Sequence, residues 1–250
     1  MWKVEILMYG GALQPTVTLA RCGREAVLVD TGYQRQEAQL LQELGRRGLT
    51  AELISCVLNT HLHFDHSHNN SLFPNARILC SRMDYEWMSA LCNRMVLDTV
   101  SLEDIYLYYP ELKSEGADPR PVWTMVKVVR RFWRMERIGR KEQMHWLEEA
   151  ALPDGVRAIH TPGHVPHHYS FVFETPEGEV LVAGDAVITR GDADEDAMTF
   201  PPACRSQYAE VKRMLLHSAA MIVPGHDAPF VGDSAAPFPP GTPAHGGSSV

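Results

Sequence analysis

The residues best suited to do chemistry are concentrated in one short segment, His61-Leu62-His63-Phe64-Asp65-His66. Three imidazoles and a carboxylate this close together need an organising group. A metal ion is such a group, because neutral imidazole nitrogen and carboxylate oxygen are good ligands for zinc and similar divalent ions. In an extended segment His61 and His63 point the same way, since side chains two apart share a face. Asp65 and His66 can serve a second ion if the chain turns. Taken alone, the segment also fits a solvated histidine-rich loop.

Three more candidate ligands lie far along the chain, each directly after an apolar run and a small or turn-forming residue. They are His164 in Thr161-Pro162-Gly163-His164, Asp185 in Ala183-Gly184-Asp185, and His226 in Pro224-Gly225-His226. Loops at strand ends along one edge of a sheet are where α/β proteins assemble their sites. Each of the three alone is better explained as an ordinary loop residue. Together with the first segment they predict one shared site.

The elements that must position these residues are short strands separated by helices. Strands are expected at 4–8, 17–20, 26–29, 54–58, 78–80, 156–159, 169–173, 180–183 and 221–223. Helices are expected over 34–47 and 206–217, the second capped by Ser206. From 84 to 152 strand signals vanish and helical spacing takes over, which predicts a helical insertion. The two strand-rich halves indicate an α/β protein with helices packed outside sheets.

In this order the motifs H-x-H-x-D-H, T-P-G-H, G-D and P-G-H resemble those of the metallo-β-lactamase superfamily, over about residues 2–232. The resemblance implies a four-layer αββα sandwich with the site at one edge between the sheets. It also implies two metal ions, held by His61, His63 and His164 on one side, by Asp65, His66 and His226 on the other, and bridged by Asp185. Asp30 matches the D-T-G that usually precedes these motifs, and its expected role is to hydrogen-bond the turn that supports the metal loop.

Length and composition limit the class of protein. The 250 residues are expected to form one metallo-β-lactamase-like domain over 1–232, with the insertion at 84–152 inside it and a disordered tail over 233–250. The net charge of −8 disfavours a general binder of nucleic acid or of membrane surfaces. Five scattered cysteines without a C-x-x-C pair indicate a reducing setting. With no signal-peptide pattern and no run near the ~18 apolar residues of a membrane span, a cytoplasmic protein is expected.

Two such ions predict hydrolysis. Cations about 3.5–4 Å apart share a bridging water, lower its pKa towards neutrality and polarise the electrophile that it attacks. Asp65 is the candidate catalytic residue, because besides binding metal it can orient the hydroxide or relay a proton. Nitrogen and oxygen ligands favour zinc, with iron, manganese and cobalt as alternatives.

The segments 61–66 and 161–170 resemble N-acyl homoserine lactonases most. This likeness implies a small-molecule substrate with a lactone or other carboxylic ester bond. The chain departs from those enzymes at Ile188, where they have a tyrosine three residues after the bridging aspartate. To replace it, a tyrosine from elsewhere would have to reach the site, and the candidates are Tyr106, Tyr108, Tyr109 and Tyr169.

Other substrates stay open, namely a thioester, or a phosphodiester including nucleic acid. A phosphodiester is favoured by the basic side of a helix predicted over 125–141, made of Lys127, Arg130, Arg134, Arg137 and Lys141. The opposite side is apolar and contains Met125, Val128, Val129, Phe132 and Met135. Such a helix can simply pack on the body with its basic face in water. It can also act as a lid over an acyl pocket or as a cationic rim for an anionic substrate. The large apolar residues of the insertion also suit a contact between two copies of the chain.

Overall fold

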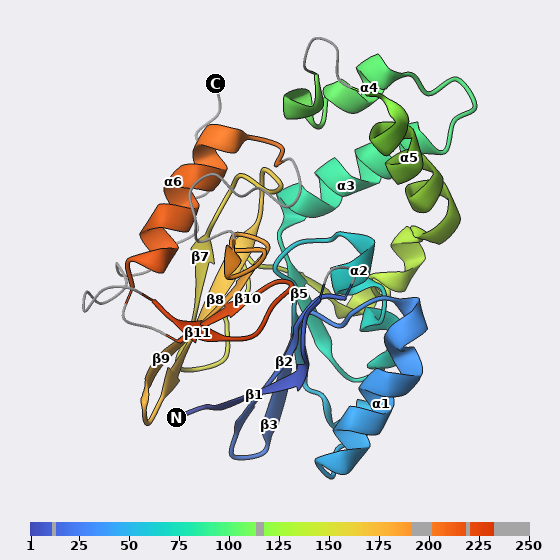
Figure 1. Cartoon of the computed structure of the whole chain (residues 1–250). Coiled ribbons are helices and arrows are strands. Elements are labelled where there is room, and N and C mark those ends of the chain that lie inside the picture. Colours follow the sequence, from blue (N-terminus) through green and yellow to red (C-terminus); the bar gives the residue numbers. More distant parts are fainter. Residues whose placement is uncertain (12–13, 114–117, 192–201, 219–220, 233–250) are drawn as a thin grey trace.

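The computed structural model of the chain describes residues 1–11, 14–113, 118–191, 202–218 and 221–232, and within them two sheets face each other (Figure 1). The first sheet has the strand order β1-β2-β3-β4-β5-β6 and the second the order β11-β10-β9-β8-β7. The strands of the first sheet are β1 (Lys3–Met8), β2 (Val17–Cys22), β3 (Glu25–Val29), β4 (Cys56–Leu58), β5 (Arg77–Cys80) and β6 (Met144–Trp146). Those of the second are β7 (Val156–His160), β8 (Tyr169–Thr175), β9 (Gly178–Gly184), β10 (Met221–Pro224) and β11 (Phe230–Val231).

The helices lie outside the two sheets and at one end of the molecule (Figure 1). They are α1 (Glu37–Arg46), α2 (Phe64–Ser67), α3 (Arg82–Met95), α4 (Leu102–Tyr106), α5 (Arg120–Phe132) and α6 (Arg205–Leu216). Short 3-10 helices occur at Gln34–Gln36, Ala51–Leu53, Asn70–Leu72, Pro110–Leu112, Met135–Arg137 and Lys141–Gln143. Among the described residues, no helix combines the length and the apolar content needed to cross a membrane.

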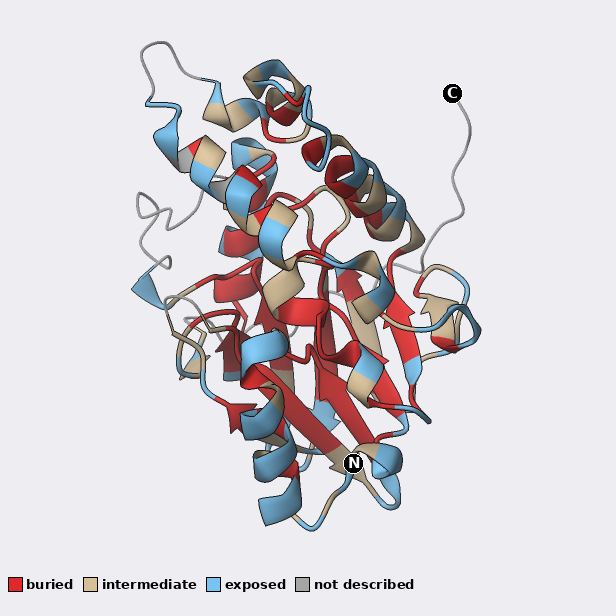
Figure 2. Ribbon diagram, turned by 90° about the vertical axis from the view of Figure 1, so that its right-hand side faces the viewer, coloured by how far each residue is buried: buried red, intermediate tan, exposed pale blue. Residues whose placement is uncertain are grey.

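Helices on the outer faces of both sheets give the four layers expected of the fold. α1 buries Leu40 and Leu44 in one cluster with Leu28 of β3, on the outer face of the first sheet. α6 buries Leu215 against the second sheet, in a cluster with Leu181 of β9. Each helix buries one apolar stripe and leaves its other side in solvent, as Figure 2 shows by the pale-blue outer faces of the helices around the buried strands.

The core between the sheets is built from strands whose successive side chains point alternately to the two faces of the sheet. Val27 and Val29 of β3 lie in one cluster with Phe171 and Phe173 of β8, whereas Leu28 faces α1. Side chains two apart share a face of a strand, so each strand fills two layers at once. The predicted α/β sandwich is confirmed.

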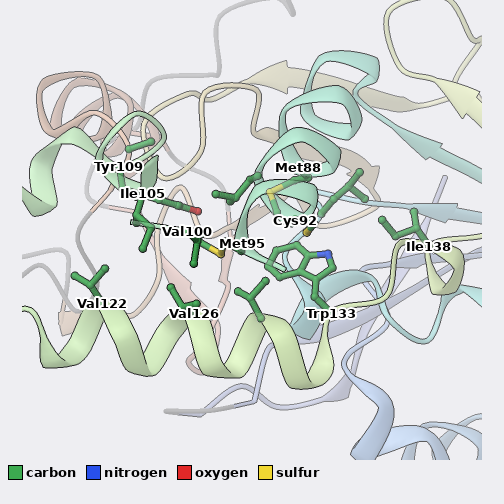
Figure 3. Packing of buried hydrophobic residues seen from close by; sticks show 14 of the residues in the cluster. Met88, Cys92, Met95, Val100, Ile105, Tyr109, Val122, Val126, Trp133 and Ile138 are labelled. Atoms are coloured by element: carbon green, nitrogen blue, oxygen red, sulfur yellow. The ribbon is translucent and has the colours of Figure 1, made fainter. Parts of the chain in front are cut away.

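The helices α3, α4 and α5 of the insertion share one apolar cluster, the insertion core, which also takes in Leu62, Cys80 and Ala203 from outside the insertion (Figure 3). Two predictions for it are wrong. First, it contains β6, which pairs in parallel with β5 and extends the first sheet. Second, the helix predicted over 125–141 ends at Phe132, because the backbone turns to an extended conformation at Trp133 and buries that indole in the insertion core. The basic residues from Arg134 onward therefore lie outside α5.

Two smaller elements also differ from the sequence predictions. α6 begins with Cys204 as its N-cap, without a side-chain hydrogen bond there, so the Ser206 cap is wrong. β11 is only two residues long and was not predicted, since so short a run has no periodicity to detect. All five cysteines have free thiols. The predicted disordered tail lies outside the described residues.

The strand directions explain where the site forms. β3 and β4 are parallel, as are β9 and β10. β7 is antiparallel to β8, which is antiparallel to β9, so β7 runs in the same direction as β9. The loops that follow the carboxyl ends of β4, β7, β9 and β10 carry polar residues. These loops meet at one edge of the two facing sheets.

Candidate metal centre

The structure brings all seven predicted ligands together at this edge. The segment from His61 to His66 follows β4, His164 follows β7, Asp185 follows β9, and His226 follows β10. Their ligand atoms form groups in which every atom lies within 4.8 Å of the others: His61, His63 and His164; His61, His66 and Asp185; and Asp65, His66 and His226. We call the His61, His63 and His164 set the first ligand group and the Asp65, His66 and His226 set the second.

Asp185 lies between the two ligand groups, and its two oxygens face different ones. Oδ2 is 3.2 Å from Nε2 of His164 in the first group. Oδ1 is 3.4 Å from Nε2 of His66 and 3.6 Å from Nε2 of His226, both in the second group. A carboxylate in this position can share its two oxygens between two neighbouring cations.

Asp30 fixes the orientation of two of the imidazoles. Its Oδ1 accepts the Thr60 N–H at 2.9 Å, and its Oδ2 accepts the Thr60 hydroxyl at 2.7 Å and Nδ1–H of His66 at 2.8 Å. Because the Thr60 hydroxyl donates to Asp30, its oxygen is left to accept from Nδ1 of His61, 3.1 Å away. When these rings are neutral, Nε2 of His61 and of His66 is the unprotonated nitrogen, with its lone pair available for a ligand. The predicted role of Asp30 is confirmed, and it extends beyond the turn.

The other imidazoles are oriented in the same way by main-chain or ring contacts. Nδ1 of His226 donates to the Gly11 carbonyl at 3.0 Å, since a carbonyl only accepts, and this leaves Nε2 facing Asp65 Oδ2 at 3.6 Å. In the first group, Nδ1 of His63 and Nε2 of His164 lie 3.1 Å apart and face each other. Two ring nitrogens this close suit a cation that both contact.

The charges around the site favour an ionised Asp185 and act in opposite directions on His61 and His66. Burial, together with the neighbouring imidazoles, lowers the pKa of His61 well below its usual range. Burial acts to raise the pKa of Asp185, but His66, His226 and His164 outweigh it and hold that pKa well below the usual range. For His66, burial acts to lower the pKa, but the carboxylates of Asp185, Asp30 and Asp65 outweigh it and raise that pKa well above its usual range. The site therefore favours positive charge next to Asp185.

The site opens on the side of His63 and Asp65. The other five candidate ligands are buried, whereas these two are half-buried, and 21% of the Asp65 side chain is exposed. The insertion borders this opening: the Trp133 ring lies 5.7 Å from the His63 ring, and Phe64 lies 5.8 Å from Trp133. Of the four tyrosines considered for the place taken by Ile188, Tyr109 contacts a candidate ligand: its hydroxyl lies 2.9 Å from Nε2 of His63, whereas Nδ1 of that ring faces His164.

A family model described as the metallo-beta-lactamase superfamily matches residues 10–226. The chain belongs to this superfamily. The superfamily is hydrolytic and metal-dependent, and both the predicted family and the predicted fold are confirmed.

Relatives within the superfamily are distant. The mouse metallo-beta-lactamase domain-containing protein 1 is 28% identical over 210 residues, which cover 83% of this chain and 61% of that protein. An N-acyl homoserine lactonase of Bacillus thuringiensis is 24% identical over 197 residues, 77% of this chain and 63% of the lactonase. The chain thus matches only 61% and 63% of the lengths of these two curated relatives. The structure of AidC, a dizinc quorum-quenching lactonase in complex with the product N-hexanoyl-L-homoserine, aligns at a TM-score of 0.62 with 16% identity, over 85% of this chain and 72% of that one. At this identity the likeness concerns the fold.

Sequence reasoning missed two polar residues beside the site. Asp84, in α3, is fully buried and accepts the main-chain N–H of Leu62 at 2.7 Å, between the first two histidines of the motif. Burial, with Glu148 nearby, raises its pKa to about 8. His168 is fully buried, and its Nδ1 lies 2.8 Å from the hydroxyl of Thr161, at the start of the loop that holds His164. The sequence feature that could have pointed to His168 is its position in the segment 161–170, which resembles the lactonases. Asp84 had none.

A glycine makes room for the central carboxylate and provides a test of the geometry. A Cβ added at Gly225 would lie 1.9 Å from Oδ1 of Asp185, far inside van der Waals contact. We expect Gly225→Ala to displace this carboxylate from the second ligand group and to lower hydrolysis by roughly a hundredfold, a loss of about 3 kcal/mol in transition-state stabilisation. The measurement is kcat/KM of the purified variant.

Gly45, exposed in α1, is the matched control because a Cβ there meets nothing within 4 Å. Gly45→Ala should leave hydrolysis unchanged and stabilise the fold by about 0.5–1 kcal/mol, since alanine is the better helix former. Equal activity of the two variants would contradict the placement of Asp185 against Gly225.

Proposed function

We propose that the chain is a dinuclear metal-dependent hydrolase that cleaves the lactone or other carboxylic ester bond of a small molecule. His61, His63 and His164 would hold one ion, Asp65, His66 and His226 the other, and Asp185 would contact both. The observation that supports this assignment most is the position of Asp185, whose two oxygens face different ligand groups at 3.2 Å and 3.4 Å.

The ligand atoms themselves fit such ions. Nε2 of His61 and Oδ1 of Asp185 are buried without a hydrogen-bond partner among the described residues. A buried polar atom left in this way costs about 1–3 kcal/mol, which a bound cation offsets. The nitrogen and oxygen donors suit zinc first, with iron, manganese or cobalt as alternatives. Ions bound there supply a water of lowered pKa and polarise the electrophile.

Asp65 is the proposed proton carrier. It is the most exposed carboxylate of the set, and its Oδ2 lies 3.6 Å from Nε2 of His226 at the open side. From this position it can take a proton from the attacking water and return it to the leaving alkoxide as the acyl–oxygen bond breaks.

The border of the opening favours a substrate with an apolar acyl part. Trp133 and Phe64 lie next to His63 there and offer aromatic surface to a small molecule. N-acyl homoserine lactonases are among the relatives, and AidC is described with an acyl homoserine product. We therefore propose an acyl lactone as the substrate class to test first.

The basic residues of the insertion give less support to a phosphodiester substrate. Arg130 donates to the carbonyls of Met95 and Leu97, and Arg137 donates to the carbonyl of His68 at 3.4 Å. Because α5 ends at Phe132, these side chains do not line one helix face. These side chains donate to carbonyls of the protein's own backbone. A nucleic-acid-binding surface would instead require them to point into solvent.

The test is a metal analysis paired with a hydrolysis screen. We expect about two divalent ions per chain, and turnover of N-hexanoyl homoserine lactone that stops on metal chelation and returns with added zinc. The screen includes an aryl thioester and bis(p-nitrophenyl) phosphate. Turnover of only one of these two would replace the lactone assignment by the thioester or phosphodiester one, and a chain without bound metal would contradict the proposal.

A further inference from the structure

We infer that Tyr109 is a positioning residue for His63, and that through it the helical insertion holds the first ligand group in its metal-binding geometry. This inference rests on the proposed metal centre, and it concerns a residue from outside the superfamily's two-sheet scaffold. It gives the insertion a role in building the site as well as in bordering it.

His63 faces the centre with the opposite nitrogen from the other motif histidines. Its Nδ1 lies 3.1 Å from Nε2 of His164, so its Nε2 points away from the centre. For His61 and His66 it is Nδ1 that points away, towards Thr60 and Asp30. The outward nitrogen of a metal-binding histidine carries the proton and needs an acceptor, which fixes both tautomer and ring orientation.

The acceptor for His63 is the phenol of Tyr109. Its oxygen lies 2.9 Å from Nε2 of His63, within normal hydrogen-bond distance. The scaffold supplies the corresponding contacts for the other histidines: Thr60 for His61, Asp30 for His66 and the Gly11 carbonyl for His226. His63 therefore depends on the insertion for the contact that the sheets provide to its neighbours.

The phenol is itself held firmly. The Tyr109 side chain is 6% exposed, its ring lies 5.5 Å from that of Trp87, and it belongs to the insertion core with Ile105 and Val122 (Figure 3). A phenol hydroxyl is neutral at physiological pH, because the ordinary pKa of tyrosine is about 10. A neutral, immobile oxygen can accept from an imidazole without drawing it away from the cation.

Two further contacts from the insertion act on the same histidine. Asp84 of α3 holds the N–H of Leu62, the residue before His63, at 2.7 Å. The Trp133 ring, just after α5, lies edge-on to the His63 ring at 5.7 Å. The insertion thus contacts the main chain just before His63, the ring of His63 and its outward nitrogen. Folding of the insertion and binding at the first ligand group should be coupled.

The test compares Tyr109→Phe with Tyr108→Phe. Tyr108 is the neighbouring residue and also packs on Trp87, at 5.6 Å, but among the described contacts its hydroxyl bonds to no ligand. We expect Tyr109→Phe to weaken binding of one of the two zinc ions by about 10–100-fold, the loss typical when the outer partner of a metal-binding histidine is removed. Competition with a chromophoric chelator measures both affinities. In the cobalt-substituted protein the visible absorption bands should shift in Tyr109→Phe and stay unchanged in Tyr108→Phe.

Several outcomes would overturn the inference. Two zinc affinities equal to those of the wild type in Tyr109→Phe would show that His63 needs no phenol, and would leave the metal centre itself intact. An equal loss in both tyrosine variants would show general loosening of the insertion. Thermal unfolding of the metal-free proteins checks the fold, and we expect similar Tm values for the two variants. A wild-type protein that binds no metal would overturn both this inference and the proposed function.

Discussion

Asp185→Asn is expected to lower the rate of ester hydrolysis by about a thousandfold, equivalent to ~4 kcal/mol of transition-state stabilisation. The amide keeps the shape of the side chain but removes its negative charge and one of the two oxygens, which face His164 at 3.2 Å and His66 at 3.4 Å. Steady-state kinetics with an acyl lactone and a count of bound metal ions measure the effect. The variant should retain fewer ions than the wild type.

Asp154→Asn is the matched control, because Asp154 is exposed and lies outside the ligand groups. It should leave both metal content and kcat/KM unchanged. If Asp185→Asn retained wild-type kcat/KM, the carboxylate would not connect two ions, and the dinuclear assignment would have to be abandoned.

Removal of Asp30 is expected to have the largest effect on stability. Asp30→Ala leaves three buried donors without their acceptor, the Thr60 N–H, the Thr60 hydroxyl and Nδ1–H of His66. It also puts alanine at a backbone φ of 56°, a left-handed conformation that aspartate and asparagine tolerate better. We expect a loss of about 3–5 kcal/mol in the free energy of unfolding, the range seen when one member of a buried network is removed. Urea unfolding measures it.

The graded variant Asp30→Asn separates these causes. Asparagine keeps one acceptor oxygen and suits the left-handed backbone, but its amide group meets donors where the second carboxylate oxygen stood. Its stability should lie between those of the wild type and Asp30→Ala. Asp154→Ala, at an exposed site, should change the free energy of unfolding by less than about 0.5 kcal/mol. If Asp30→Ala unfolded at the wild-type urea concentration, the network around Thr60 would not bear on stability.

Local patterns in the sequence were enough to find nine of the eleven strands in the described part of the chain and to single out the seven candidate ligands. The site residues stand directly after apolar runs, and alternation places the side chains of β3 and β8 on known faces. His61, His63 and His66 lie so close in sequence that their contacts follow from spacing alone. The role of Asp30 came from a three-residue motif next to a strand end. All of these depend on residues within one element and the loop that follows it.

Contacts between distant segments were beyond such reasoning. Tyr109 meets His63 across 46 positions and Asp84 meets Leu62 across 22, and nothing near either residue indicates its partner. Tyr109 could only be named as one of four tyrosines. The end of α5 at Phe132 was missed for a related reason, because the helical spacing continues past it and only the packing of Trp133 in the insertion stops the helix.

The origin of the ligands from both halves of the sandwich has a consequence for the folded state as a whole. The segment 61–66 follows a strand of the first sheet, whereas His164, Asp185 and His226 follow strands of the second. Cations bound between them, as proposed, would tie one half of the molecule to the other. Removal of metal should therefore separate the two sheets first at the edge that holds the candidate ligands. Amide exchange should become faster at the carboxyl ends of β4 and β9, while the opposite edge of the sandwich stays protected.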